Sequence, residues 1–212
     1  MKFLIGGLIS LALIGKAEAA IWEFDLGGLG GSGLLGANEV DHLPNSFASG
    51  KEIGHNEIPG ILYDDEQKVL EFHVGWGSHE VVQGANLTGQ YLTSGLFGPA
   101  TMSQNAPQAL YTFDTSNGYV VTSNDPTGRT GFIHARVQLV DMGTYTVAAQ
   151  EADLLGSRFY FNIMSTAFES GEIRGQLLSV IPEPAEYASV AAGALLVAGM
   201  LHRRWKLKKV EC

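Results

Sequence analysis

Five histidines lie between residues 20 and 180, and imidazole nitrogens are common ligands of transition metals. They are His42, His55, His73, His79 and His134. A metal site needs several such rings in one place. Only His73 and His79 are close in the sequence, and they do not form a His-x-His pair on one strand face. We therefore interpret the histidines as structural or solvated, and we predict no metal ligand and no cofactor.

Asp64, Asp65 and Glu66 form an acidic cluster that could bind calcium, because hard cations prefer carboxylate oxygens. The cluster lacks the alternating Asp-x-Asp-x-Asp-Gly spacing of a calcium loop, which favours a solvated turn. The chain has no Gly-x-Ser-x-Gly elbow for a serine nucleophile. We predict no catalytic residue and a protein that is not an enzyme. The alternative is an exported metal-binding or hydrolytic enzyme that uses the domain histidines and acidic residues.

The N-terminus has the pattern of a secretory signal peptide. Lys2 provides a positive charge, residues 3–15 are apolar, and Ala17-Glu18-Ala19 is a small-x-small cleavage site before Ala20. We expect residues 1–19 to be removed on export.

The C-terminus combines a short motif, an apolar run and a basic cluster. Pro182-Glu183-Pro184 comes first, and its prolines favour an extended chain that an enzyme can bind. Residues 187–201 would span about 22 Å as a helix, which is short against a hydrocarbon core of about 30 Å. Lys and Arg can extend the span and mark its cytoplasmic side. The basic stop-transfer residues are Arg203, Arg204, Lys206, Lys208 and Lys209.

In this order, the three parts resemble the PEP-CTERM sorting signal of Gram-negative bacteria. The resemblance implies that a membrane exosortase recognises Pro182, Glu183 and Pro184 and cleaves near them. It also implies release or re-anchoring of the domain at the cell surface. In two respects the tail departs from the pattern: Lys outnumbers Arg, and the chain continues to Cys212.

Between the two ends, alternating apolar residues predict many short strands. The period of two is clearest in residues 70–76, 133–139 and 159–163, where one face would be buried and the other solvated. Shorter strands are predicted at 22–26, 34–40, 58–63, 109–113, 119–122 and 172–178, with one helical turn within 145–155. Glu172 and Arg174 would form an exposed ion pair worth under about 1 kcal/mol. The pattern predicts an all-β antiparallel sandwich or barrel.

Charge and cysteine content limit the partners of this domain. Residues 20–181 contain 18 Asp and Glu against 6 Lys and Arg, a formal charge of −12. Such a domain would repel nucleic acid and anionic surfaces. Its stability cannot depend on a disulfide, because Cys212 is the only cysteine.

The strands also resemble those of the CHRD, or chordin-like, family over about residues 24–180. The resemblance rests on Leu35-Gly36-Ala37-Asn38-Glu39-Val40, on residues 60–64 and 70–76, and on Gly171-Glu172-Ile173-Arg174-Gly175-Gln176. It implies an immunoglobulin-like β-sandwich without established catalytic activity. Gly95-Leu96-Phe97 stands where the family has two histidines before Gly98-Pro99-Ala100, so a role for those histidines cannot be carried over.

Together, these features predict a signal peptide at 1–19, a CHRD-like domain at 20–180 and a sorting signal at 181–212, with a single transmembrane helix at about 187–202. We expect a non-enzymatic exported protein of the cell surface or extracellular matrix. Before processing it would be anchored in the inner membrane by the C-terminal helix. Expected partners are the exosortase, the secretion machinery and extracellular polysaccharide or other exported proteins, but not nucleic acid.

Overall fold

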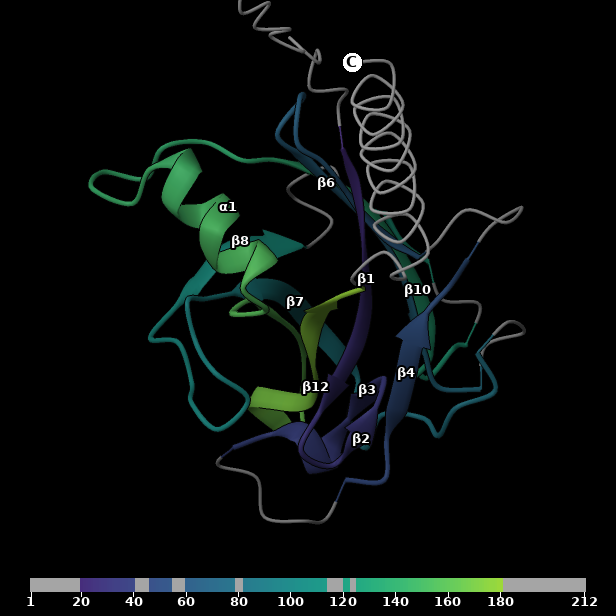
Figure 1. Ribbon diagram of the computed structural model, residues 1–212. Helices are drawn as coiled ribbons and strands as arrows, with labels where there is room; N and C mark the ends of the chain where they lie inside the picture. Colours follow the sequence, from purple (N-terminus) through teal and green to yellow (C-terminus); the bar gives the residue numbers. More distant parts are fainter. Residues whose placement is uncertain are drawn as a thin grey trace, which may run out of the picture. The chain divides into compact units, whose positions relative to one another are not determined.

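Figure 1 shows the computed structural model of the protein, which describes residues 20–40, 46–54, 60–78, 82–113, 120–122 and 125–180. Its strands are β1 (Ile21–Gly28), β2 (Gly31–Ser32), β3 (Leu34–Leu35), β4 (Ser49–Glu52), β5 (Ile61–Asp64), β6 (Val69–Trp76), β7 (Tyr91–Phe97), β8 (Ala109–Phe113), β9 (Val120–Thr122), β10 (Gly131–Gln138), β11 (Tyr160–Ser165) and β12 (Phe168–Ser179). All their pairings are antiparallel. The all-β prediction is therefore confirmed.

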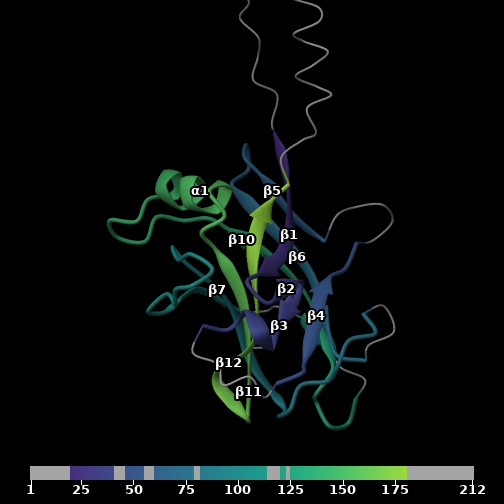
Figure 2. The ribbon, with the colours of Figure 1, turned by 60° about the horizontal axis from the view of Figure 1, so that its bottom comes forward.

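The strands form one continuous sheet that folds into two halves. In one half, β10 and β9 lie along one edge of β6, while β5 and β4 share its other edge. In the other half, β12 pairs with β11, which leads to β7 and β8. β1 joins the halves, because residues 21–23 pair with β5 and residues 24–27 pair with β12. Figure 2 shows β1, β5 and β12 meeting near the upper end of the described domain.

The core lies between these halves. Leu70, Phe72, Val74 and Trp76 of β6 are fully buried, as their alternation predicts. The ring of Phe72 lies 5.5 Å from that of Phe113 in β8 and 5.7 Å from that of Phe161 in β11. These ring contacts show that the two halves pack face to face.

One helix, α1 (Val147–Leu155), covers part of the described domain. It begins after Thr146, whose hydroxyl accepts a hydrogen bond from the amide of Ala149 and caps the first turn. Gln150 is fully buried: its Oε1 accepts from the Tyr111 hydroxyl, and its Nε2 donates to two backbone carbonyls. Polar side chains thus fix this helix to the sheet. It is the element predicted within residues 145–155.

Three details of the strand prediction are wrong. Residues 34–40 contain only the short β3, because the chain then turns into a 3₁₀ helix at Gly36–Asn38. The strands β4 and β7 were not predicted, since serine, glycine and threonine interrupt their apolar pattern. In β11 both faces are buried, including Tyr160 and Asn162, which alternation places in solvent.

Within the described residues, no helix is long and apolar enough to cross a membrane. The predicted signal peptide at 1–19 and the sorting signal at 181–212, with its helix at about 187–202, lie outside these residues.

Candidate functional site

Two of the five histidines considered as metal ligands lie side by side on neighbouring strands. His73 in β6 lies directly opposite His134 in β10, and their ring centroids are 4.0 Å apart. The backbone of His73 bonds to Gly60 and Ile53, away from β10. In antiparallel sheets, residues that face each other without exchanging backbone bonds have the closest side chains. The pairing geometry therefore explains the close approach of the two rings, which are tilted by 35°.

The surroundings of this histidine pair do not complete a metal site. Arg136 and Glu71 form an ion pair of 3.4 Å two residues along the same strands. Among the described residues, no group of three or more His, Cys, Asp or Glu side chains could hold a metal. His42, His55 and His79 lie outside the described residues. Two imidazoles alone fall short of the three or four protein ligands usual for zinc.

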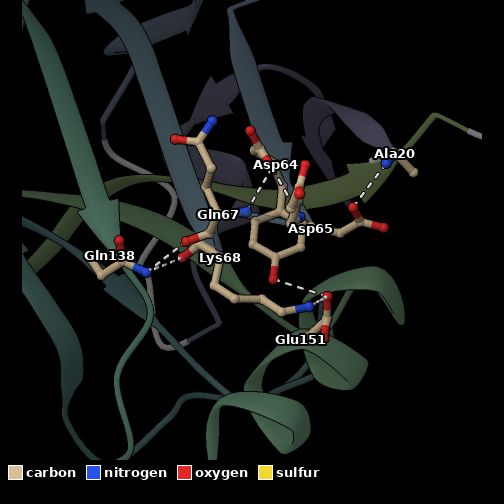
Figure 3. A network of polar contacts seen from close by, with 9 residues as sticks. Ala20, Asp64, Asp65, Gln67, Lys68, Gln138 and Glu151 are labelled. Atoms are coloured by element: carbon tan, nitrogen blue, oxygen red, sulfur yellow. Dashed lines mark hydrogen bonds and ion pairs between the residues drawn. The ribbon is translucent and has the colours of Figure 1, made fainter. Parts of the chain in front are cut away.

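In the acidic turn after β5, two of the three carboxylates accept hydrogen bonds from backbone nitrogens. Asp64 Oδ1 accepts hydrogen bonds from the amides of Glu66 and Gln67, which stabilise the turn. Asp65 Oδ1 accepts a hydrogen bond of 2.8 Å from the backbone nitrogen of Ala20. Figure 3 shows these contacts beside the Lys68–Glu151 ion pair. The structure thus gives Asp64 and Asp65 roles within the fold.

A row of buried polar side chains follows one face of β12, where an exposed ion pair was expected. Glu172, Arg174 and Gln176 are all at most 1% exposed. The prediction of an exposed Glu172–Arg174 pair is therefore wrong. Residues 100–105 pass over this face of the strand and contact it through Ala100, Thr101 and Asn105. Two-residue periodicity along β12 cannot reveal such a cover, because it comes from a distant part of the chain.

Glu172 is held as a buried carboxylate by donors from other segments. Its Oε1 accepts from the Ser46 hydroxyl at 2.8 Å and from the Thr88 amide at 2.5 Å. Burial by itself would raise the pKa of this group, but hydrogen bonds from Ser165, Thr88 and Ser46 outweigh it and lower the pKa below the ordinary 4.5. The carboxylate therefore stays charged at neutral pH and ties three segments to β12.

Arg174 has a different set of partners. Its guanidinium donates to Asn105 Oδ1, to the Thr101 carbonyl and to Gln176 Oε1, at 3.0–3.2 Å. The guanidinium carbon also lies 3.5 Å from the centre of the Tyr160 ring, a cation–π contact. Burial lowers the pKa of Arg174, and the nearby Tyr160 and Glu39 oppose this only in part. The planar fork of arginine suits these separated acceptors.

Gln176 connects the row to the Gly-Pro-Ala segment. Its Nε2 donates to the carbonyls of Ala100 and Ser157, at 2.9 and 2.8 Å. The amide of Ala100 in turn donates to the carbonyl of Arg158. Ala100, the last residue of Gly98-Pro99-Ala100, thus closes a buried network that holds the cover on β12. This network can maintain the fold, but within the described residues it has no access to a substrate.

An open groove lies on another part of the surface, beside β4. It has a volume of about 360 Å³ and is lined by Ser32, Gly33, Leu35, Ser49, Gly50, Lys51, Glu52, Val82, Gln83 and Gly84. Its lining mixes hydroxyl, amide and charged side chains with the apolar Leu35 and Val82. No sequence pattern indicates this groove, because its walls come from three separate segments.

Comparison with known proteins identifies the family of the chain. A CHRD domain profile matches residues 34–177, about two thirds of the chain. The chain belongs to the CHRD domain family. The matched segment includes the buried row of β12 and most of the residues on which the resemblance rests. Neither the curated proteins nor the solved structures contain a match to the chain.

The CHRD match begins at Leu34, but the folded domain begins earlier. β1 precedes the matched segment, yet it pairs with β12 through residues 24–27 and with β5 through residues 21–23. Phe24 and Leu26 of this strand are buried in the core. The CHRD domain of this chain therefore includes an N-terminal strand that the family match does not cover.

The predicted sorting residues cannot be placed relative to the CHRD domain. Pro182, Glu183 and Pro184, and the basic residues Arg203, Arg204, Lys206, Lys208 and Lys209, lie outside the described residues.

Proposed function

We propose that this CHRD protein is a non-enzymatic component of the cell surface or extracellular matrix. In this proposal it is exported by a signal peptide, held in the inner membrane by its C-terminal helix and processed by an exosortase. The observation that carries the proposal is the order of parts after the domain. β12 ends at Ser179, three residues before Pro182-Glu183-Pro184, and the apolar run and the basic cluster follow. We also propose that the strands of this sandwich have an immunoglobulin-like arrangement.

Intact-mass analysis of the native membrane and medium fractions tests the processing. We expect the wild-type product to lack residues 1–19 and the residues beyond about Pro184. The Pro182→Ala/Pro184→Ala variant should keep its tail. Glu186→Ala, just outside the motif, is a matched control that should be processed normally. A native product that retains Cys212 would show that the tail is only an anchor.

The groove beside β4 is our candidate for the contact with extracellular polysaccharide or another exported protein. Its hydroxyl, amide and charged side chains, among them Ser49, Gln83 and Lys51, can form hydrogen bonds to such a partner. Lys51→Glu combined with Gln83→Ala should raise the fraction of processed protein found in the medium. Arg136→Glu, a charge reversal in β10, is the control and should leave the distribution unchanged. Equal distributions for all three proteins would remove the groove from the proposal.

The close pair of histidines favours one competing hypothesis, an exported metal-binding or hydrolytic enzyme. The 4.0 Å separation of His73 and His134 is the observation behind it. Elemental analysis of the purified protein separates the two hypotheses. Stoichiometric zinc, copper or iron that is lost in His73→Ala and His134→Ala would support the metalloprotein and contradict the scaffold.

A further inference from the structure

The first described residue, Ala20, is held from both sides by one residue of the acidic turn. Its backbone nitrogen donates to Asp65 Oδ1 at 2.8 Å, and its carbonyl accepts from the Asp65 amide at 3.2 Å. The next residue, Ile21, pairs with Asp64 and begins the ladder between β1 and β5. In Figure 3 the nitrogen of Ala20 faces the Asp65 carboxylate directly. The position of this nitrogen is therefore fixed by the fold.

The charges around this contact are mainly negative. Asp65 lies between Asp64 and Glu66, and Asp64 Oδ1 accepts from two amides of the turn. The cations beside this turn already have carboxylate partners: Lys68 lies 2.7 Å from Glu151, and Arg136, which donates to Gln67, pairs with Glu71. In the described parts of the chain, no lysine or arginine forms an ion pair with Asp65. A positive charge at the Ala20 nitrogen would therefore meet an unneutralised carboxylate at hydrogen-bond distance.

Removal of a signal peptide before Ala20 would create that charge. Hydrolysis of the Ala19–Ala20 peptide bond by water leaves a carboxylate on Ala19 and an α-ammonium group on Ala20. We propose that Asp65 is the binding site for this new α-ammonium group. The amide hydrogen bond then becomes a charge-assisted one, roughly twice as strong as its neutral counterpart. This inference rests on the signal-peptide part of the proposed function.

The test compares the chain without its signal peptide, residues 20–212 in detergent, with the same chain acetylated at the Ala20 nitrogen. Acetylation keeps one N–H donor but removes the charge. In the wild type it should lower the urea midpoint by about 0.1–0.5 M, the range expected for an exposed ion pair. In Asp65→Asn it should have no effect. Glu66→Gln removes a charge from the same turn but not the contact, so it should retain the wild-type response.

A second variant covers the case in which Asp65→Asn does not fold. One glycine added before Ala20 moves the α-ammonium group from Ala20 to the added glycine. The urea midpoint should then fall as it does on acetylation. Equal midpoints for the free, acetylated and extended chains would overturn the inference, as would an equal acetylation effect in Asp65→Asn.

Failure of the export proposal would give a different result. Mass analysis of the protein from cells would then show a chain that still carries Met1 or starts at another residue, whatever the urea midpoints show. The two proposals can therefore fail separately.

Discussion

At Glu172, a carboxylate remains charged inside the sheet because its neighbours donate hydrogen bonds to it. Its folded-state pKa lies below the ordinary 4.5, which the unfolded chain should approach. Between these two values the unfolded state binds more protons than the folded one. The contribution of Glu172 to stability is therefore complete above about pH 4.5 and is lost as the pH falls through the folded-state pKa.

The Glu172→Gln variant tests this linkage. In this variant, either an N–H group of the glutamine faces the donors of Ser46 and Thr88, or these donors lose their charged acceptor. We therefore expect the free energy of unfolding at pH 7 to fall by about 1–3 kcal/mol. The difference from wild type should be smaller at pH 4 than at pH 7, because the contribution of the lowered pKa is lost as the pH falls below about 4.5. Urea unfolding at both pH values measures it. Glu169→Gln, exposed on the same strand, is the control; a difference independent of pH would contradict the assignment.

Arg174 provides a second test at the scale of single residues. Arg174→Lys keeps the charge but cannot reach Asn105, Thr101 and Gln176 together, so we expect a loss of about 2–3 kcal/mol in the free energy of unfolding. Arg136→Lys, in an exposed pair, should change it by less than about 0.5 kcal/mol. Thermal and urea unfolding would show both effects. Similar values for the two variants would mean that the buried fork contributes little.

At the scale of elements, α1 is held to the sheet by the buried Leu154 and by the hydrogen bonds of the buried Gln150. Gln150 links the helix to Tyr111 of β8 and to the carbonyls of Val140 and Tyr145. Gln150→Ala should cost about 1–3 kcal/mol, because these groups lose their partner inside the protein. Hydrogen exchange should become faster in α1 and in residues 140–146 while β6 stays protected. Ala148→Gln, at an exposed helix position, should leave the exchange unchanged; uniform loss of protection would indicate a global effect instead.

The elements that could be predicted from the sequence are those whose pattern is local. β6 and β10 each bury one face, so their alternation predicts them and their core residues. β4 and β7 lack that alternation, and β11 buries side chains of both faces, including Tyr160 and Asn162. Aligning residues 70–76 antiparallel to residues 131–137 places His73 opposite His134, but alternation alone does not fix this register. The cover on β12 and the groove depend on contacts between distant segments, which spacing alone does not show.

At the scale of the whole molecule, packing and hydrogen bonds must hold the CHRD domain together without covalent links. Cys212 is the only cysteine, and it lies outside the domain. We expect the melting temperature to be the same with and without dithiothreitol, and the same in Cys212→Ser. Differential scanning calorimetry measures both. A decrease on reduction would show that Cys212 links two chains and that this link adds stability.

The pairing of β1 with β12 also sets an order of events in time. β1 is the first strand of the domain to be synthesised. Its residues 24–27 can form their ladder only after residues 176–179, at the end of the last strand, have been synthesised. Contacts so distant in sequence form slowly. In a chain exported in N-to-C order, residues 24–27 would therefore lack their partner strand until nearly the whole domain had crossed. Ala20 and residues 21–23 need only β5 and Asp65, so the bond before Ala20 would be accessible to a peptidase until residues 61–65 had crossed, and after that Asp65 would hold Ala20 on the C-terminal side of this bond.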